Sequence, residues 1–129
     1  EYISSRPDLK PRFKFLGKLP RSKMHLVYSG CDFLVQTSLR ESCGFVGLEA
    51  MTYRLPIIST AAGAIPEILG SAPIYYRKRD HAVLAHRMLD LSFDEKKIET
   101  MKNRSSRRAK MFSLEKMAEN YIRVYEGCG

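Results

Sequence analysis

Residues 37–58 read TSLRESCGFVGLEAMTYRLPII, and this stretch decides the fold class. An apolar run with the length and composition of a strand, residues 32–35, comes just before it, so residues 37–43 are predicted to be the loop that leaves the carboxyl end of that strand. Apolar residues at helical spacing follow Gly44 until Pro56 forces the chain out of the helix, and a second strand begins at Ile57. Strand, loop, helix and strand in this order predict an α/β fold.

The loop and the amino end of this helix have the composition of an anion site. Free backbone N–H groups and the helix dipole converge at the amino end of a helix that follows a buried strand, and Gly44 lets a ligand approach the backbone closely. Glu49 lies about one turn into the helix, and Glu41 lies in the loop. A glycine and two acids around one anion site suggest a ligand that carries both a phosphate and sugar hydroxyls.

The same residues resemble the motifs of the retaining, nucleotide-sugar-dependent glycosyltransferases of family four. Glu41 and Glu49 have the E-x7-E spacing of that family. Four stretches also agree in order with the family's "PSxxE", "GLVxLEAM", "PVV" and "GGIPE": residues 38–41, 44–51, 56–58 and 63–67. Four ordered motifs arise by chance far less often than one spacing, so the resemblance is specific.

The resemblance implies the GT-B fold, in which two Rossmann-like domains face each other across a cleft. Residues 1–129 look like most of the second, donor-binding domain, a Rossmann-like parallel sheet with helices on both faces, present in part. A chain of this length can bury one core and form a single domain. A predicted helix at residues 113–126 is placed to pack toward the N-terminal domain of such an enzyme. We expect the absence of upstream strands to leave one sheet edge open.

The resemblance also implies roles for individual residues. Glu49 corresponds to the acid that accepts hydrogen bonds from the donor's ribose hydroxyls, and Glu41 to the catalytic-site acid near the transferred sugar. The other donor-binding positions are the backbone N–H groups of Cys43, Gly44 and Phe45 toward sugar hydroxyls, that of Val46 toward a phosphate, and the loop at Leu19 beside the base. Simpler interpretations are a helix acid that complements the dipole, a solvated loop acid and an ordinary surface turn.

Four positions depart from the family's motifs. Cys43 stands where an aromatic residue is usual, Thr37 replaces a proline, and Ala64 replaces the second glycine of "GGIPE". Arg54 replaces a glycine before Pro56. If that position requires a positive φ, the arginine costs about 1 kcal/mol or more. We therefore expect strain at Arg54.

The composition argues against several classes of protein. No apolar run approaches the ~20 residues needed to cross a bilayer, and the chain begins with neither a signal peptide nor an initiator methionine, so we expect part of a longer soluble, cytoplasmic protein. Cys31, Cys43 and Cys128 are odd in number and lack metal-ligand spacing, and the three histidines are scattered. We expect no metal and no cofactor, with a nucleotide-diphosphate sugar as donor substrate.

A formal net charge of +8 favours anionic partners: nucleotide diphosphates, acidic lipid head groups or nucleic acid. Five basic residues crowd one predicted helical segment, namely Lys102, Arg104, Arg107, Arg108 and Lys110. They indicate either docking on acidic lipids at the cytoplasmic face of a membrane or an ordinary solvated helix face. Nucleic acid is the weakest of these partners, because no reader motif accompanies the basic residues.

The rest of the chain predicts short strands and capped helices. Strands are expected at residues 12–16, 32–36, 57–60 and 74–76, and helices at 22–29, 81–91, 94–111 and 113–125, with a short helix at Pro66. Ser22, Asp80, Asp94 and Ser113 are the expected N-caps. The first residues, 1–10, are expected to be the tail of an earlier element and a loop.

These observations favour a retaining, metal-independent glycosyltransferase that acts on a hydroxyl acceptor, saccharide or lipid-linked, in polysaccharide, lipopolysaccharide or glycolipid synthesis. Two alternatives stay open: a binding module that keeps the nucleotide-sugar pocket without catalysis, and a basic Rossmann-like adaptor for anionic lipid or nucleic acid. In the family, the cations that neutralise the leaving diphosphate lie upstream of the motifs found here. We therefore expect this chain alone to be inactive.

Overall fold

The computed structural model describes residues 5–127, so the predicted tail at residues 1–4 and Cys128 lie outside the described part. Three short strands form a parallel sheet in the order β1-β2-β3: β1 is Leu34–Gln36, β2 is Ile57–Thr60 and β3 is Ile74–Tyr76. Leu34 pairs with Ile57, and Ile58 pairs with Ile74. All four residues of the central strand are buried. The predicted α/β class with a parallel sheet is confirmed.

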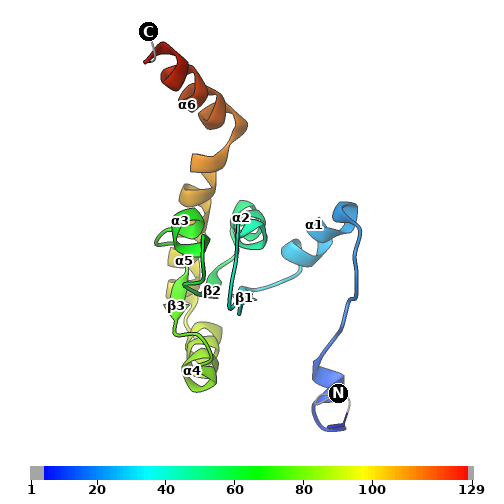
Figure 1. Ribbon diagram of the computed structural model, residues 1–129. Helices are drawn as coiled ribbons and strands as arrows, with labels where there is room; N and C mark the ends of the chain where they lie inside the picture. The colour runs from blue at the N-terminus through cyan, green and yellow to red at the C-terminus, as the bar shows by residue number, and fades with distance from the viewer. Residues whose placement is uncertain (1–4, 128–129) are drawn as a thin grey trace.

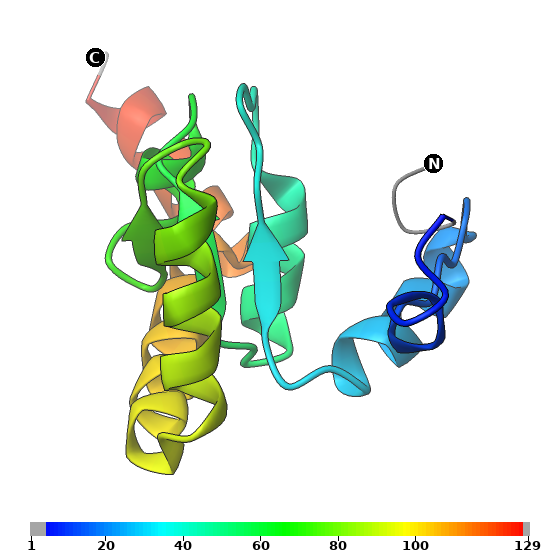
Figure 2. The ribbon, with the colours of Figure 1, turned by 90° about the horizontal axis from the view of Figure 1, so that it is seen from below.

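The helices cover both faces of this sheet (Figures 1 and 2). In chain order they are η1 Lys10–Arg12, α1 Arg21–Ser29, α2 Phe45–Thr52, α3 Ile65–Leu69, α4 His81–Ser92, α5 Glu95–Ala109, η2 Lys110–Phe112 and α6 Leu114–Glu126. Successive side chains of a strand point to opposite faces, so Ile57 and Ile58 enter different core clusters. Ile57 packs with Met51 of α2 and Leu69 of α3, whereas Ile58 packs with residues of α4 and α5.

Three of the four predicted helix caps are confirmed. The side chains of Asp80, Asp94 and Ser113 each accept a hydrogen bond from the backbone N–H three residues further on, at 3.0, 2.9 and 3.2 Å. Each bond satisfies one of the donors that a helix start leaves free. The predicted cap at Ser22 is wrong: α1 begins at Arg21, and extended Pro20 is its N-cap without a side-chain bond.

The predicted strand at residues 12–16 is also wrong. Arg12 ends the short helix η1, and residues 13–17 are irregular, with Phe15 77% exposed. A strand needs a hydrogen-bonding neighbour, and in the described part of the chain β1 is an edge strand with no further strand on its outer side. Figures 1 and 2 show this segment and α1 lying apart from the sheet, beyond β1. The alternating pattern therefore finds nothing to pair with here.

The last helix, α6, extends beyond the end of α5 (Figure 1). None of its residues is buried, although it is strongly amphipathic. Its exposed apolar side chains include Leu114, Met117, Tyr121, Ile122, Val124 and Tyr125. The predicted helix at residues 94–111 is split into α5 and η2, and the helical turn at η2 leads into the Ser113 cap.

Candidate functional site

The candidate site lies where the three parallel strands end. The loops that follow β1, β2 and β3 meet at this edge of the sheet and line a pocket of about 490 Å³. Its lining residues are Leu39, Arg40, Glu41, Ser42, Gly63 and Lys78. Ligands of open α/β sheets bind outside the carboxyl ends of the strands, so the fold places Glu41 where the sequence predicts it.

Two hydrogen bonds hold the loop that carries Glu41 against the end of β2 and the loop that follows it. The N–H of Ala64 donates to the carbonyl oxygen of Glu41 across 3.1 Å, and the Thr60 hydroxyl donates to the carbonyl oxygen of Ser38 across 2.6 Å. Gly63 has a φ of +52°, and a Cβ there would lie 2.0 Å from the Glu41 carbonyl oxygen. Only glycine fits this close approach. Ala64, which replaces the second glycine of the family's "GGIPE" motif, is the next residue and has an ordinary φ of −74°.

The Glu41 carboxylate accepts several donors from its own loop. The N–H of Cys43 lies 3.4 Å from Oε1, the Ser38 hydroxyl lies 3.4 Å from Oε2, and the amide Nε2 of buried Gln36 lies 3.5 Å from Oε2. The backbone N–H groups of Gly44, first, and Cys43 lower the pKa of Glu41 below its usual value. Donors to a carboxylate favour its charged form, so Glu41 is ionised at neutral pH. The Cys43 N–H, expected to meet a sugar hydroxyl, here contacts Glu41.

The amino end of α2 is open. Gly44 is its N-cap, with a left-handed φ of +66° and no side-chain cap. The N–H groups of Gly47 and Leu48 donate back to the Gly44 carbonyl oxygen, at 3.1 and 3.2 Å. In the described part of the chain, the N–H groups of Phe45 and Val46 have no acceptor. These two free donors and the helix dipole form an end that suits an anion.

Glu49 is the fifth residue of α2 and faces α1. The Tyr28 hydroxyl donates to its Oε2 atom across 2.9 Å, and the Arg21 Nη2 atom lies 3.9 Å from Oε1. The Glu49 side chain is 38% exposed, so it lies outside the packed core. Glu49 does not line the pocket beside Glu41.

Tyr28 was not identified from the sequence as a partner of Glu49. Tyr28 is 5% exposed and stacks on Tyr53, with ring centroids 5.4 Å apart. A buried tyrosine usually finds a partner for its hydroxyl, and this was the one signal available.

Leu19 is half-buried just ahead of α1 and belongs to neither core cluster. Its place beside a nucleotide base stays a prediction.

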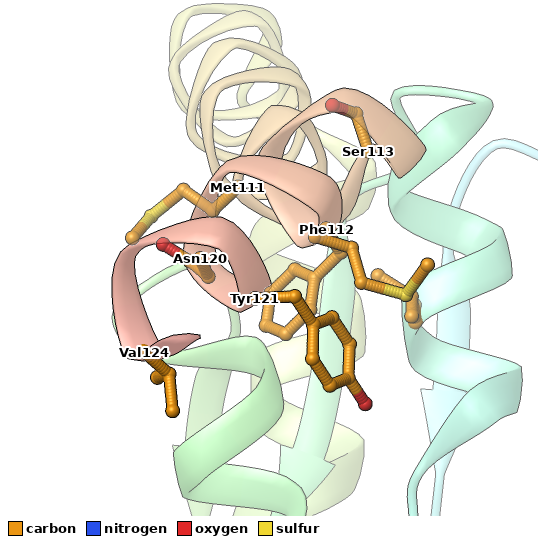
Figure 3. A pocket seen from close by; sticks show the side chains of 8 residues that line it. Met111, Phe112, Ser113, Asn120, Tyr121 and Val124 are labelled. Carbon is orange, nitrogen blue, oxygen red and sulfur yellow. The ribbon is translucent and has the colours of Figure 1, made fainter. Parts of the chain in front are cut away.

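A second hollow of about 520 Å³ lies away from the strand ends, between α6, η2 and α2 (Figure 3). Its lining is mostly apolar: Leu48, Met111, Phe112, Ser113, Met117, Asn120, Tyr121 and Val124. It shares no residue with the pocket beside Glu41 and contains no charged side chain. It contains no cation to neutralise a diphosphate, so we do not assign it to the donor.

One of the five basic residues predicted on one helical segment, Arg108, has its side chain bonded to another part of the fold. The guanidinium of Arg108 is turned onto α3, where its Nε atom donates to the Ile68 carbonyl oxygen across 2.8 Å and its Nη2 atom donates to that of Glu67. Arg104, Arg107 and Lys110 are exposed. Arg108 therefore stabilises the packing of α5 on α3. Lipid docking by the other basic residues stays a prediction.

Among residues 5–127, the histidine, cysteine, aspartate and glutamate side chains form no group of three that could hold a metal ion. Within the same residues, no helix has the length and apolar composition that spanning a bilayer requires.

Comparison with known proteins gives a consistent result. The family described as Glycosyl transferases group 1 matches residues 2–108. The chain is 26% identical over 113 residues to O-antigen chain mannosyltransferase B of Escherichia coli, and 31% identical over 120 residues to N-acetyl-alpha-D-glucosaminyl L-malate synthase of Bacillus anthracis. These matches cover 88% and 91% of this chain, but only 30% and 31% of the relatives.

The fold has a match among solved structures. A sucrose-phosphate synthase from Thermosynechococcus elongatus superposes with a TM-score of 0.81 at 22% sequence identity. The match covers 94% of this chain and 31% of that enzyme. The three-stranded parallel sheet and its flanking helices thus have the fold of a GT-B glycosyltransferase domain. The chain spans about a third of the length of the proteins it matches.

Proposed function

We propose that this chain, which belongs to the Glycosyl transferases group 1 family, is the donor-binding part of an enzyme that transfers a sugar from a nucleotide-diphosphate sugar to a hydroxyl acceptor. The acceptor would be a saccharide or a lipid-linked saccharide, and transfer would proceed with retention and without a metal ion. The observation that carries the proposal is the open amino end of α2 immediately beside the ionised carboxylate of Glu41.

The geometry supports separate roles for the groups around α2 in binding the diphosphate, the ribose and the transferred sugar. The free N–H groups of Phe45 and Val46 would hold the diphosphate, because a helix amino end stabilises negative charge. Glu49, one turn further and partly exposed, would accept hydrogen bonds from the ribose hydroxyls. Glu41 would lie at the transferred sugar, where its negative charge would stabilise the positive charge that develops at the anomeric carbon.

The open end of α2 agrees less well with one of the two rival functions, the basic adaptor. A basic adaptor for lipid or nucleic acid would need no helix amino end at the strand tips and no acid fixed beside it. A module that binds nucleotide sugar without catalysis would keep both features, so only an activity measurement separates it from an enzyme. Tight donor binding without sugar transfer in the full-length protein would favour the module.

The decisive experiment uses the full-length protein and three variants. Calorimetry with a panel of nucleotide sugars should identify a donor, and Glu49→Ala should weaken its binding by about tenfold or more, the value of one charge-assisted hydrogen bond. Glu41→Gln should leave donor affinity nearly unchanged and reduce transfer by about 100-fold or more. Glu115→Gln, an exposed acid of α6, is the matched control. A Glu49→Ala protein with unchanged affinity would reject the ribose role.

The exposed apolar face of α6 fits the same proposal. Relatives are about three times as long as this chain, and the predicted role of residues 113–126 is to pack toward the other domain. In the full-length protein we expect the hollow between α6 and α2 to be covered by that domain. Hydrogen exchange should then be slow at Tyr121 and Val124, and rapid exchange at both would contradict the packing.

The proposal also includes a location in the cytoplasm or on the cytoplasmic face of a membrane.

A further inference from the structure

The pocket beside Glu41 contains two cations whose charge nothing in the described chain balances. Arg40 comes from the loop after β1 and Lys78 from the loop after β3, and both residues line the pocket. Within residues 5–127, neither forms a hydrogen bond or an ion pair. Arg54, by contrast, pairs with Glu99 across 3.0 Å.

Glu41 is the acidic residue that lines the same pocket, but its carboxylate oxygens face other donors. Its Oε1 atom faces the Cys43 N–H, and its Oε2 atom faces the Ser38 hydroxyl and Gln36 amide. The other acid of the region, Asp80, caps α4 through the Val83 N–H. Arg40 and Lys78 thus present their charges to the pocket rather than to a neighbour.

This pair is distinct from the donors expected to hold the diphosphate. The pocket residues do not include Phe45 or Val46, whose N–H groups are free at the start of α2. The loop of Lys78 also carries Arg77 and Arg79, which line a neighbouring hollow together with Lys78 and Asp80. A second negative group of the substrates, separate from the diphosphate, would be stabilised here.

We propose that Arg40 and Lys78 select an anionic substituent, a carboxylate or a phosphate, on the sugar that enters the pocket beside Glu41. A guanidinium matches the planar or forked oxygens of these groups with two parallel hydrogen bonds, and an ammonium supplies a second, mobile charge. The anion could belong to the acceptor sugar or to the transferred sugar of the donor. This inference rests on the proposed function, which places a sugar in the pocket. It adds that this sugar carries an anionic group.

A binding measurement tests the pocket without relying on transfer. Calorimetry on the full-length protein would compare glucose, glucose 6-phosphate and glucuronate as probes. At least one charged probe should bind about tenfold or more tightly than glucose, and Lys78→Gln or Arg40→Gln should remove that advantage. Lys96→Gln, an exposed lysine of α5, should not. Equal binding of all three probes, or an advantage that survives both substitutions, would overturn the proposal.

Kinetics on the same variants identify the source of the anion and separate the two proposals. Loss of kcat/KM in Lys78→Gln with a charged acceptor alone assigns the anion to the acceptor, and loss with a uronic acid donor alone assigns it to the donor. A loss that is equal for charged and neutral substrates contradicts the anion role. If no nucleotide sugar binds at all, the proposed function fails, whereas the probe experiment still decides whether the pocket binds anions.

Discussion

The hydroxyl of Tyr28 donates a hydrogen bond to the Oε2 atom of Glu49 across 2.9 Å and joins α1 to α2. Tyr28 is buried, so its hydroxyl needs this acceptor, and Glu49 gains a fixed rotamer in return. The Oε1 atom keeps only a long contact of 3.9 Å with the exposed Arg21. One oxygen of the acid is thereby held in place while the other stays available to a ligand.

Tyr28→Phe should weaken donor binding in the full-length protein by roughly threefold to tenfold, because Glu49 loses its orienting bond but keeps its charge. Calorimetry with the donor measures this directly. The effect should be smaller than that of Glu49→Ala. A larger loss would mean that the Tyr28 hydroxyl itself contacts the donor, and no loss would refute the orienting role.

The same hydrogen bond predicts a dependence of stability on alkaline pH. Burial, with the bond to Glu49 second, raises the pKa of Tyr28 to about 12. The folded state therefore favours the neutral phenol, so this stabilisation is complete below the unfolded pKa of about 10 and is lost as pH rises toward 12. Between pH 10 and 12, the free energy of unfolding should fall more steeply for the wild type than for Tyr28→Phe. Parallel curves in denaturant titrations would contradict the linkage.

Gly47→Ala should destabilise the protein by about 1–2 kcal/mol, although alanine is the better helix former. A Cβ at Gly47 would lie 2.7 Å from Cδ1 of Leu69, 2.9 Å from its Cδ2 and 3.0 Å from Oε1 of Gln36. Denaturant unfolding measures the loss. Leu69→Val makes room at the contact, so the double variant should be more stable than the sum of the single effects predicts. Strict additivity would show that the clash is not the cause.

The features predicted well from the sequence are those that a few adjacent residues determine. The helix α2 follows Gly44 and ends at Thr52, ahead of Pro56. The caps at Asp80 and Asp94 depend on a side chain and the backbone three residues away. The motifs around Glu41 identified the family for the same reason, since they lie within one continuous stretch.

The features that were missed depend on partners far away in the sequence. The alternating residues 12–16 form no strand, because a strand needs a hydrogen-bonding neighbour and this segment lies apart from the sheet (Figures 1 and 2). The bond between Tyr28 and Glu49 spans 21 residues, and no local pattern of apolar spacing reveals it. In the same way, helical spacing grouped Arg108 with four other basic residues, although its side chain reaches α3 from 40 positions away.

The strain predicted at Arg54 is present, and it can be measured. Arg54 has a φ of +59°, and its guanidinium pairs with Glu99 and with the Asn103 side chain, at 3.0 and 3.3 Å. Both partners are exposed, so these contacts offset at most about 1 kcal/mol. Arg54→Gly should therefore be more stable than Arg54→Ala by about 1 kcal/mol, because both lose the contacts but only glycine escapes the strain. Equal thermal stabilities would show that the left-handed backbone costs nothing here.

Arg108 is predicted to be the basic residue of α5 on which the fold depends most. Its guanidinium caps the carboxyl end of α3 through the carbonyl oxygens of Ile68 and Glu67, and it lies 5.1 Å from the ring centroid of Phe112. Arg108→Met keeps the stem but leaves two carbonyls without donors, so it should destabilise the protein by about 2–3 kcal/mol in denaturant titrations. Arg108→Lys should recover only part of this, because an ammonium lacks the planar fork. Arg107→Met, on the exposed side, should change stability by less than about 0.5 kcal/mol. Similar losses at both positions would mean that general charge, rather than the cap on α3, accounts for the effect.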